Sequence, residues 1–397
     1  MAATLPEVDL DRLAADARAG GRLGLDTEFM TEGRYHALLC LVQVSVEDPA
    51  APAGVRVELI DPLARTGDPA PLAAVLADPA VDVVLHAARQ DVAILRRVWD
   101  TEIPGVWDTQ IAAGFAGFAA QAGYVNLLGE ALGVRLPKSA SFTRWDVRPL
   151  TSEQLEYARG DVLYLLALAD RLRERLRETG REGWVRDECA ALERVSDTRD
   201  PGEAWRRLPK ATNLPAGART VARELAAWRE ETAQVEDRPV ASVLADAALV
   251  EIARRRPASA SELGTIRGVH GGVLRRRGED VLRAVARGAA KPPMAREPES
   301  GPGLTARDAP LVSLAEAFLR QRALEEGLAY EVLATRADLN RVVGAARHGR
   351  DSDGTRVLEG WRREVAGEEL LELLAGRRSL TVAPGGLEVG STSPPSR

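Results

Sequence analysis

Cysteine, lysine and long apolar runs are scarce in this sequence of 397 residues. Its two cysteines, Cys40 and Cys189, are too few for a disulfide framework and lack the CxxC spacing of a metal site. The longest purely apolar run, residues 162–169, falls far short of the roughly 20 residues that cross a bilayer. The first residues are acidic and contain no apolar signal region, so we expect a soluble, cytoplasmic protein without membrane contact.

Positive charge is unevenly distributed along the chain. The net charge of −6 argues superficially against a nucleic-acid partner, because phosphate binding needs clustered positive charge. Residues 1–190 hold 20 basic and 29 acidic side chains, whereas residues 212–290 hold 13 basic and 10 acidic ones. Only three of the 53 basic residues are lysine, a bias that GC-rich codons explain, so the arginine excess is not evidence for phosphate contacts. The overall sum therefore hides an acidic first half and a basic central block.

The length and the apolar fraction of 45% predict two or three globular domains. Two stretches interrupt the chain: residues 196–211 have mixed charge and two prolines, and residues 291–303 have four prolines. These breaks divide the sequence into an α/β domain over 1–195, a linker over 196–211, a helical block over 212–290, a linker over 291–303, a second helical block over 304–377 and a flexible tail over 378–397.

The first block mixes strand and helix patterns. After a helical segment at 10–19, three β-rich runs at 23–29, 38–46 and 55–60 are joined by short connections that are typical of antiparallel hairpins. Strands and helices then alternate, as in parallel sheets, through a helix at 71–77, a strand at 81–86 and a helix at 91–98. We therefore predict a mixed sheet flanked by helices.

Two further helices have clear start signals. Asp108 is a suitable N-cap for a helix that follows Trp107, and Thr151 with Gln154 forms a capping box. From Leu155 to Ala169 the apolar residues keep helical spacing, which predicts one helix across this stretch.

Asp26 and Glu28 stand two residues apart in the first strand run and so point to the same face. Two carboxylates on one face repel each other, and a hard divalent cation such as Mg²⁺ would relieve this repulsion. The alternative interpretation is a pair of solvent-facing acids on an edge strand. Asp91 follows a later strand, and Tyr157 lies one helical turn from Asp161 at the edge of a buried stripe, so these two side chains share a face.

Together these motifs resemble the DEDD family of 3′→5′ exonucleases, in its tyrosine subtype. The flanking segments resemble those of the ribonuclease D type: LDTEF at 25–29, LIDPL at 59–63, LHAARQD at 85–91, WDTQI at 107–111, KSASFTRW at 138–145 and RPLTSEQLEYARGD at 148–161. The resemblance implies a ribonuclease-H-like fold with a mixed five-stranded sheet. It also implies that Asp26, Glu28, Asp91 and Asp161 hold two divalent metal ions, Mg²⁺ or Mn²⁺, and that Tyr157 orients the attacking water. His86 has the spacing of a catalytic histidine but lies in the wrong motif, so we interpret it as structural.

The resemblance also places a polar loop at the active site, where Lys138, Ser139, Ser141, Thr143 and Arg144 are candidates for contacts with the terminal nucleotides. Phe29 and Met30 are candidates for packing on the 3′ base, although Phe29 fits a simple core position equally well.

The helical blocks resemble the HRDC domain (helicase and RNase D C-terminal), the second one more weakly. LAAWR at 225–229, DRPV at 237–240, ARRRP at 253–257 and LGTIRG at 263–268 carry the resemblance in the first block. Because such modules are usually nucleic-acid binders, two arginine runs are candidate RNA-backbone contacts, with a solvated surface as the alternative: Arg254, Arg255 and Arg256, and Arg275, Arg276 and Arg277.

The sequence therefore predicts a metal-dependent 3′→5′ exoribonuclease that releases nucleoside 5′-monophosphates, with tRNA 3′-end processing and RNA turnover implied by the resemblance. No organic cofactor or obligate protein partner is expected. A DNA 3′→5′ exonuclease with the same site remains an alternative, because nothing in the sequence reads a 2′-hydroxyl. A silent RNA-binding scaffold would require a broken acid set, whereas all four acids and the tyrosine are present.

Overall fold

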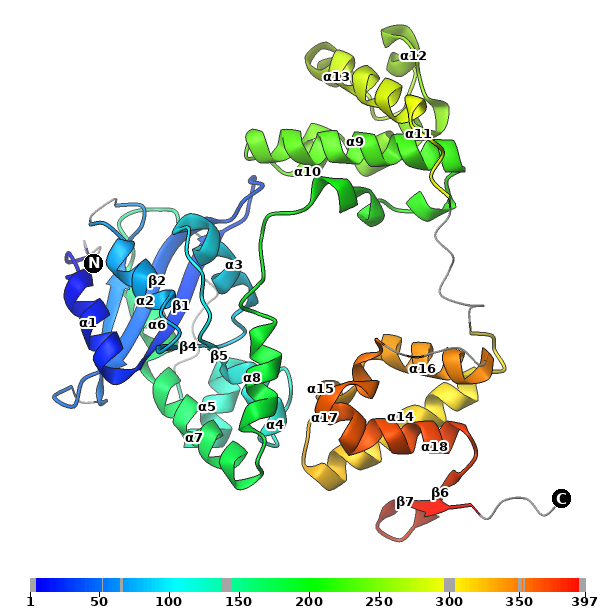
Figure 1. Cartoon of the computed structure of the whole chain (residues 1–397). Helices are drawn as coiled ribbons and strands as arrows, with labels where there is room; N and C mark the ends of the chain where they lie inside the picture. The colour runs from blue at the N-terminus through cyan, green and yellow to red at the C-terminus, as the bar shows by residue number, and fades with distance from the viewer. Residues whose placement is uncertain are drawn as a thin grey trace.

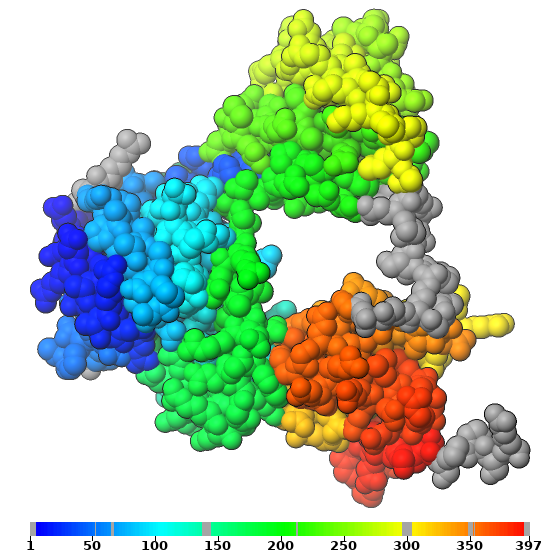
Figure 2. All heavy atoms as spheres, in the orientation of Figure 1, coloured from blue at the N-terminus to red at the C-terminus, as the bar shows by residue number. Residues whose placement is uncertain are grey.

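The chain folds into an α/β domain followed by two helical modules (Figure 1). The computed structural model describes residues 5–51, 53–64, 67–136, 144–295, 304–348, 352 and 354–392. We call residues 201–294 the first module and residues 304–391 the second module. The modules lie against different parts of the α/β domain and leave open space between them (Figure 2). Among the helices of these described ranges, none is long and apolar enough to span a membrane.

Five strands form one mixed sheet in the order β3-β2-β1-β4-β5. They are β1 (Arg22–Met30), β2 (Leu38–Glu47), β3 (Val55–Ile60), β4 (Asp82–Leu85) and β5 (Val106–Asp108). The first three pair antiparallel, as their short connections predict, and β4 and β5 add in parallel. The mixed five-stranded sheet is thus confirmed. The residue pattern alone did not reveal β5, since three residues are too few to show alternation.

Helices cover both faces of the sheet. The α/β domain contains α1 (Leu10–Gly20), α2 (Ala70–Leu76), α3 (Arg89–Val98), α4 (Thr109–Phe115), α5 (Tyr124–Leu132), α6 (Ser152–Leu163), α7 (Leu165–Glu178) and α8 (Glu182–Ala190). Leu13 of α1 and Val92 of α3 share an apolar core with Leu25 of β1. On the opposite face, Leu155 of α6 belongs to a cluster with Leu41 of β2. Successive side chains of β1 therefore point alternately into the layer of α1 and α3 and into the layer of α6.

α6 begins as predicted but ends earlier. Thr151 Oγ1 accepts a hydrogen bond from the Gln154 backbone at 3.2 Å, and Gln154 Oε1 accepts one from the Thr151 backbone at 3.0 Å. The single helix expected through Ala169 is instead broken at Tyr164, where φ is −108° and ψ is 6°. The apolar spacing persists because α6 and α7 cover the same sheet face, so the periodicity could not reveal the break.

The first module contains more of the chain than the sequence indicates. Its helices are η1 (Pro201–Arg207), η2 (Ala211–Asn213), α9 (Ala216–Val235), α10 (Val240–Val243), α11 (Asp246–Arg255), α12 (Ala260–Gly264) and α13 (Gly271–Ala290). The proposed linker over 196–211 is wrong in its second half, because Trp205 and Leu208 are buried in the core of this module. These short 3₁₀ helices were not predicted because the segment is rich in proline and charged residues, which are typical of a linker. At the other end, Met294 packs back on the module, and its backbone donates to Thr220 at 2.8 Å.

The second module ends in a β-hairpin that the sequence analysis assigned to a flexible tail. It contains α14 (Ala309–Glu326), α15 (Tyr330–Leu333), α16 (Arg336–His348), η3 (Arg356–Leu358), α17 (Gly360–Arg362), the π-helical turn η4 (Arg363–Gly367), α18 (Glu368–Leu374), β6 (Arg378–Ala383) and β7 (Gly386–Ser391). Leu380 and Val389 of the hairpin pack against the core of this module. The two-residue turn at Pro384 and Gly385 was the signal that could have predicted it.

The first module holds the tip of the β1–β2 hairpin. Asp237 Oδ1 accepts hydrogen bonds from the backbone N–H groups of Tyr35 (3.1 Å) and His36 (3.0 Å), and Asp237 Oδ2 pairs with Arg34 at 2.8 Å. The Tyr35 hydroxyl donates to the buried Glu230 of α9 at 2.6 Å. This module is therefore connected to the loop that directly follows β1.

The second module docks on the opposite end of the α/β domain. The Trp361 ring stacks on Trp184 of α8 with centroids 4.7 Å apart and packs edge-on against Phe115 of α4 at 5.1 Å. Glu188 of α8 pairs with Arg356 (3.0 Å) and Arg362 (2.7 Å). This contact joins the apolar core of the α/β domain to that of the second module.

Candidate active site

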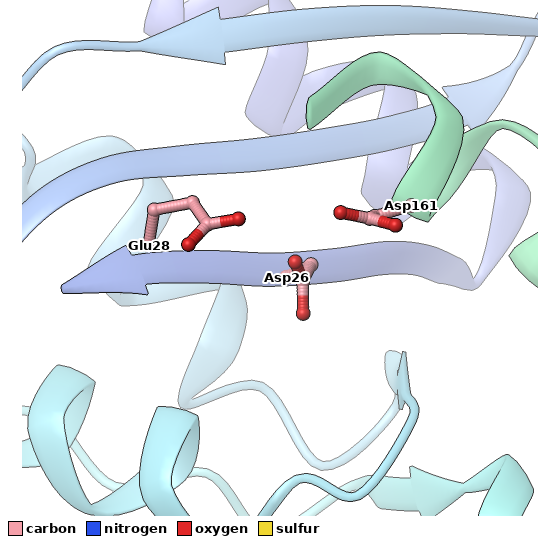
Figure 3. Close-up of side chains that lie close together, drawn as sticks. All are labelled: Asp26, Glu28 and Asp161. Atoms are coloured by element: carbon pink, nitrogen blue, oxygen red, sulfur yellow. The ribbon is translucent and has the colours of Figure 1, made fainter. Parts of the chain in front are cut away.

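Three carboxyl groups meet where β1 passes under α6. Asp26, Glu28 and Asp161 each offer an oxygen that lies within 4.8 Å of the other two. Asp26 and Glu28 project from the same face of β1, and Asp161 approaches from α6 (Figure 3). Strand alternation and the helix that crosses this face thus bring together acids that lie more than 130 positions apart in the sequence.

Asp91 adjoins this cluster from another direction. It lies in the first turn of α3, is 7% exposed, and accepts a hydrogen bond from the Thr27 hydroxyl. β4 pairs with β1 only at Arg22–Gly24. In the described ranges, the edge of β1 after Gly24 is therefore free of a strand partner on that side, and the start of α3 lies beside it. Asp91 is not one of the three acids with closely spaced oxygens, yet its charge raises the pKa of Asp26.

The site strongly disfavours its own negative charge. Burial, followed by the charges of Asp91, Asp161 and Glu28, raises the pKa of Asp26 well above its usual range. Burial also raises the pKa of Glu28 to about 8, with the charges of Asp161 and Asp91 adding to it, and that of Asp161 to about 7. An all-oxygen donor set with this much mutual repulsion fits a hard divalent cation.

Tyr157 lies one turn before Asp161 on α6 and is hydrogen-bonded to it. Burial, and then the charge of Asp161, raises the pKa of Tyr157 above its usual value. The ring packs against the buried Trp145 with centroids 6.1 Å apart. The phenol therefore stays protonated and is held in place, which suits orientation of a water molecule better than removal of its proton.

Tyr124 was missed by the sequence analysis. It begins α5, and its buried hydroxyl is close enough to the acids that, after burial, the charge of Asp161 raises its pKa. A lone tyrosine at a helix start carries no pattern that would have identified it.

His86 and Asp108 have structural roles here, as the sequence predicts. The two ring nitrogens of His86 hydrogen-bond to Thr109 Oγ1 at 2.9 Å and to the Ala122 carbonyl at 3.0 Å, and burial lowers its pKa. Asp108 caps α4 by accepting from the Gln110 backbone at 2.8 Å.

Comparison with known proteins identifies the family. A family model described as 3′-5′ exonuclease matches residues 2–177, and the HRDC domain model matches residues 218–285. Ribonuclease D of Granulibacter bethesdensis is 37% identical, over 94% of this chain and 92% of that protein. The chain belongs to the ribonuclease D family. Ribonuclease D of Gluconacetobacter diazotrophicus is 36% identical, over 94% of this chain and 93% of its own length.

A solved structure agrees with this assignment. Escherichia coli RNase D, described as an exoribonuclease involved in structured RNA processing, superposes with a TM-score of 0.77. It is 29% identical, and the match covers 95% of this chain and 99% of that one. The protein is thus a 3′→5′ exoribonuclease, and its first module is an HRDC domain. The HRDC-like nature of the second module stays a prediction.

Some of the substrate-binding residues expected for a ribonuclease D lie near the acids. Met30 packs in the cluster that contains Trp145 and Tyr157, whereas Phe29 packs on the α1–α3 side of the sheet. Arg144 is exposed and paired with Asp146 at 2.9 Å. Four residues expected in the same loop lie outside the described residues: Lys138, Ser139, Ser141 and Thr143.

The two arginine runs of the HRDC domain divide into exposed and buried members. Arg254 and Arg255 are exposed, and both pair with Glu251. Arg256, Arg275 and Arg276 are exposed as well. Arg277 does not fit the expectation of an RNA contact, because it is 6% exposed and both of its terminal nitrogens bind Glu236, at 3.0 and 2.6 Å. Arg277 is therefore a buried ion-pair partner rather than a candidate RNA contact.

Proposed function

We propose that this ribonuclease D family member trims 3′ extensions from structured RNA, tRNA precursors in particular, by a two-metal hydrolysis. The convergence of Asp26, Glu28 and Asp161, with Asp91 beside them and Tyr157 bonded to Asp161, carries the proposal. The four carboxylates would hold the ions, Mg²⁺ or Mn²⁺. When bound, such ions activate water and neutralise charge at the phosphate.

The reaction is a hydrolysis in which Tyr157 positions the water. Tyr157 orients the attacking water through its hydroxyl, which stays protonated. Water forms a new bond to the last phosphorus, the bond from phosphorus to the preceding 3′ oxygen breaks, and that oxygen takes up a proton. The product is a nucleoside 5′-monophosphate, and the shortened RNA keeps a free 3′-hydroxyl.

RNA would be held at two places. At the active site, Met30 packs on the terminal base, while Arg144 with Lys138, Ser139, Ser141 and Thr143 contacts the sugar–phosphate chain. Phe29 packs on the other side of the sheet and is therefore a core residue rather than a base contact. In the HRDC domain, exposed arginines contact the backbone further upstream: Arg254, Arg255, Arg256, Arg275 and Arg276. The relative described as acting in structured RNA processing supports a structured substrate. The expected cytoplasmic location stays a prediction.

One set of assays tests this proposal. The full-length protein is incubated with a 3′-extended tRNA, an unstructured RNA and a single-stranded DNA, each with Mg²⁺, Mn²⁺ or a chelator. We expect 5′-monophosphates to be released from the 3′ end of both RNAs, fastest from the tRNA extension, and no release in chelator. Degradation that survives chelation would contradict the metal mechanism, and equal rates on DNA would favour the alternative substrate.

A further inference from the structure

A buried amide lies directly across the sheet from the first catalytic acid. Gln43 of β2 is the cross-strand partner of Asp26 and is 0% exposed. Opposed residues of antiparallel strands present their side chains to the same face, with Cβ atoms about 4.5–5.5 Å apart. Gln43 therefore lies under α6, on the face that carries the carboxyl groups of Asp26 and Glu28.

Neither end of this amide has a partner. Within the part of the chain that the structure describes, Oε1 and Nε2 of Gln43 are both buried and make no hydrogen bond. Interior amides normally find partners, and β2 is otherwise almost wholly apolar here, so a leucine or methionine would fill the position without leaving polar atoms unpaired. The local packing of β2 does not explain an amide at this position.

The acids offer an explanation. Asp26 lies closest to Gln43 in the strand register, and an ionised carboxylate accepts hydrogen bonds from several donors at once. Carboxylates that bind metals are commonly fixed by such outer hydrogen bonds, which set the direction of the oxygen that faces the ion.

We propose that Gln43 is a positioning residue of the active site: when the metal ions bind, its side-chain N–H, which is unpaired within the described part of the chain, donates to the Asp26 carboxylate and turns the other Asp26 oxygen toward Glu28 and Asp161. This inference rests on the proposed metal-dependent function. It requires no contact between Gln43 and the RNA or the ions, because Gln43 acts only through Asp26.

The same strand supplies a matched control. Ser45 lies two residues along β2 on the same face, is also 0% exposed, and its buried hydroxyl also makes no hydrogen bond among the described residues. Its cross-strand partner, however, is Gly24, which has no carboxylate. Ser45→Ala therefore removes an equally buried, equally unpartnered polar group that lies directly opposite no acid.

The experiment measures Mn²⁺ binding to the full-length, RNA-free protein by calorimetry, with melting temperature in chelator as a second readout. Gln43→Met conserves volume and removes the donor, so we expect Mn²⁺ affinity to fall about 10-fold or more, with an unchanged melting temperature. On RNA at saturating Mg²⁺ we expect kcat to fall and KM to stay the same. Ser45→Ala should keep wild-type Mn²⁺ affinity.

Two results would overturn the inference: wild-type Mn²⁺ affinity in Gln43→Met, or an equal loss in Ser45→Ala. If Gln43→Met does not fold, Gln43→Leu decides, because it also removes the donor and should weaken Mn²⁺ binding in the same direction. Wild-type affinity in Gln43→Leu would then refute the role of Gln43. Failure of the wild-type protein to bind Mn²⁺ would instead refute the proposed function.

Discussion

At the scale of single residues, the acid cluster opposes the fold when no cation is bound. An acid whose pKa is higher in the folded chain than in the unfolded chain stabilises the fold only while it is protonated. Its contribution is complete below the unfolded pKa of about 4 and is lost as pH rises through the folded pKa. For Asp161 and Glu28 the folded values are about 7 and about 8.

We therefore predict that Asp161→Asn raises the melting temperature of the metal-free protein, and by more at pH 8.5 than at pH 5.5. Differential scanning fluorimetry in chelator measures this effect. Mg²⁺ should raise the wild-type melting temperature more than that of the variant. Glu279→Gln removes an exposed carboxyl of α13 and serves as the control. An Asp161→Asn variant that is no more stable than wild type at pH 8.5 would contradict the prediction.

Tyr157 should act on turnover rather than on binding. Because Tyr157→Phe removes the hydroxyl that orients the attacking water, we expect it to lower kcat by about 10²-fold. The ring and its packing on Trp145 remain, so KM for RNA should stay close to the wild-type value. Single-turnover kinetics on a short RNA measure this, and near-normal turnover would remove Tyr157 from the chemistry.

At the scale of elements, the loop after β1 is held by a different domain. Asp237 accepts hydrogen bonds from two backbone N–H groups and from the Arg34 side chain. Burial alone would raise the pKa of Asp237, but these hydrogen bonds hold it below the usual range. We predict that Asp237→Ala frees the β1–β2 loop and raises KM for RNA several-fold, with Mn²⁺ affinity unchanged. Asp246→Ala is the control, since Asp246 pairs with Arg229 inside the HRDC domain. An unchanged KM in Asp237→Ala would show that the loop keeps its position without this contact.

The elements also show which parts of the fold a sequence can predict. The start of α6 was predictable because a capping box depends on two residues only, Thr151 and Gln154. Its end at Tyr164 was not, because the packing of α7 sets that break. Likewise, the burial of Trp205 depends on α9, which lies beyond it in the chain, so local composition suggested a linker.

The same distinction applies to the active site. Asp26, Glu28, Tyr157 and Asp161 were predictable because strand and helix periods fix which face each occupies. Gln43 and Tyr124 were not, since only the strand register and the placement of α5 bring them to the acids.

At the scale of the whole molecule, the excess of basic residues lies in the HRDC domain rather than in the acidic α/β domain. We predict that the double variant Arg275→Ala, Arg276→Ala weakens RNA binding and makes it less sensitive to salt. Each phosphate contact to a single strand contributes about 0.7 to the slope of log K against log salt, so the slope should change by about 1.4. Filter binding at salt concentrations between about 50 and 200 mM measures the slope. Arg363→Ala, on the second module, is the control, and an unchanged slope in the double variant would exclude this face as the binding surface.

The two modules also differ in how they attach to the α/β domain. The first is held by polar contacts at a loop, and the second by a buried aromatic stack. We predict that Trp361→Ala destabilises the protein by about 3–5 kcal/mol, as expected for a buried tryptophan, and releases the second module. Small-angle scattering should show a larger radius of gyration, whereas Val382→Ala, at an 87% exposed site, should change neither property. A compact Trp361→Ala variant would mean that the ion pairs of Glu188 suffice for docking.

The length of β1 decides which of its side chains reach the active site. Asp26 and Glu28 face α6, while Thr27 between them faces the other way and holds Asp91. Deleting or inserting one residue upstream in this strand would exchange the two faces, turning both acids toward the apolar layer and Thr27 toward the cluster. We therefore expect selection to remove insertions or deletions of a single codon between positions 22 and 26, even where point substitutions accumulate.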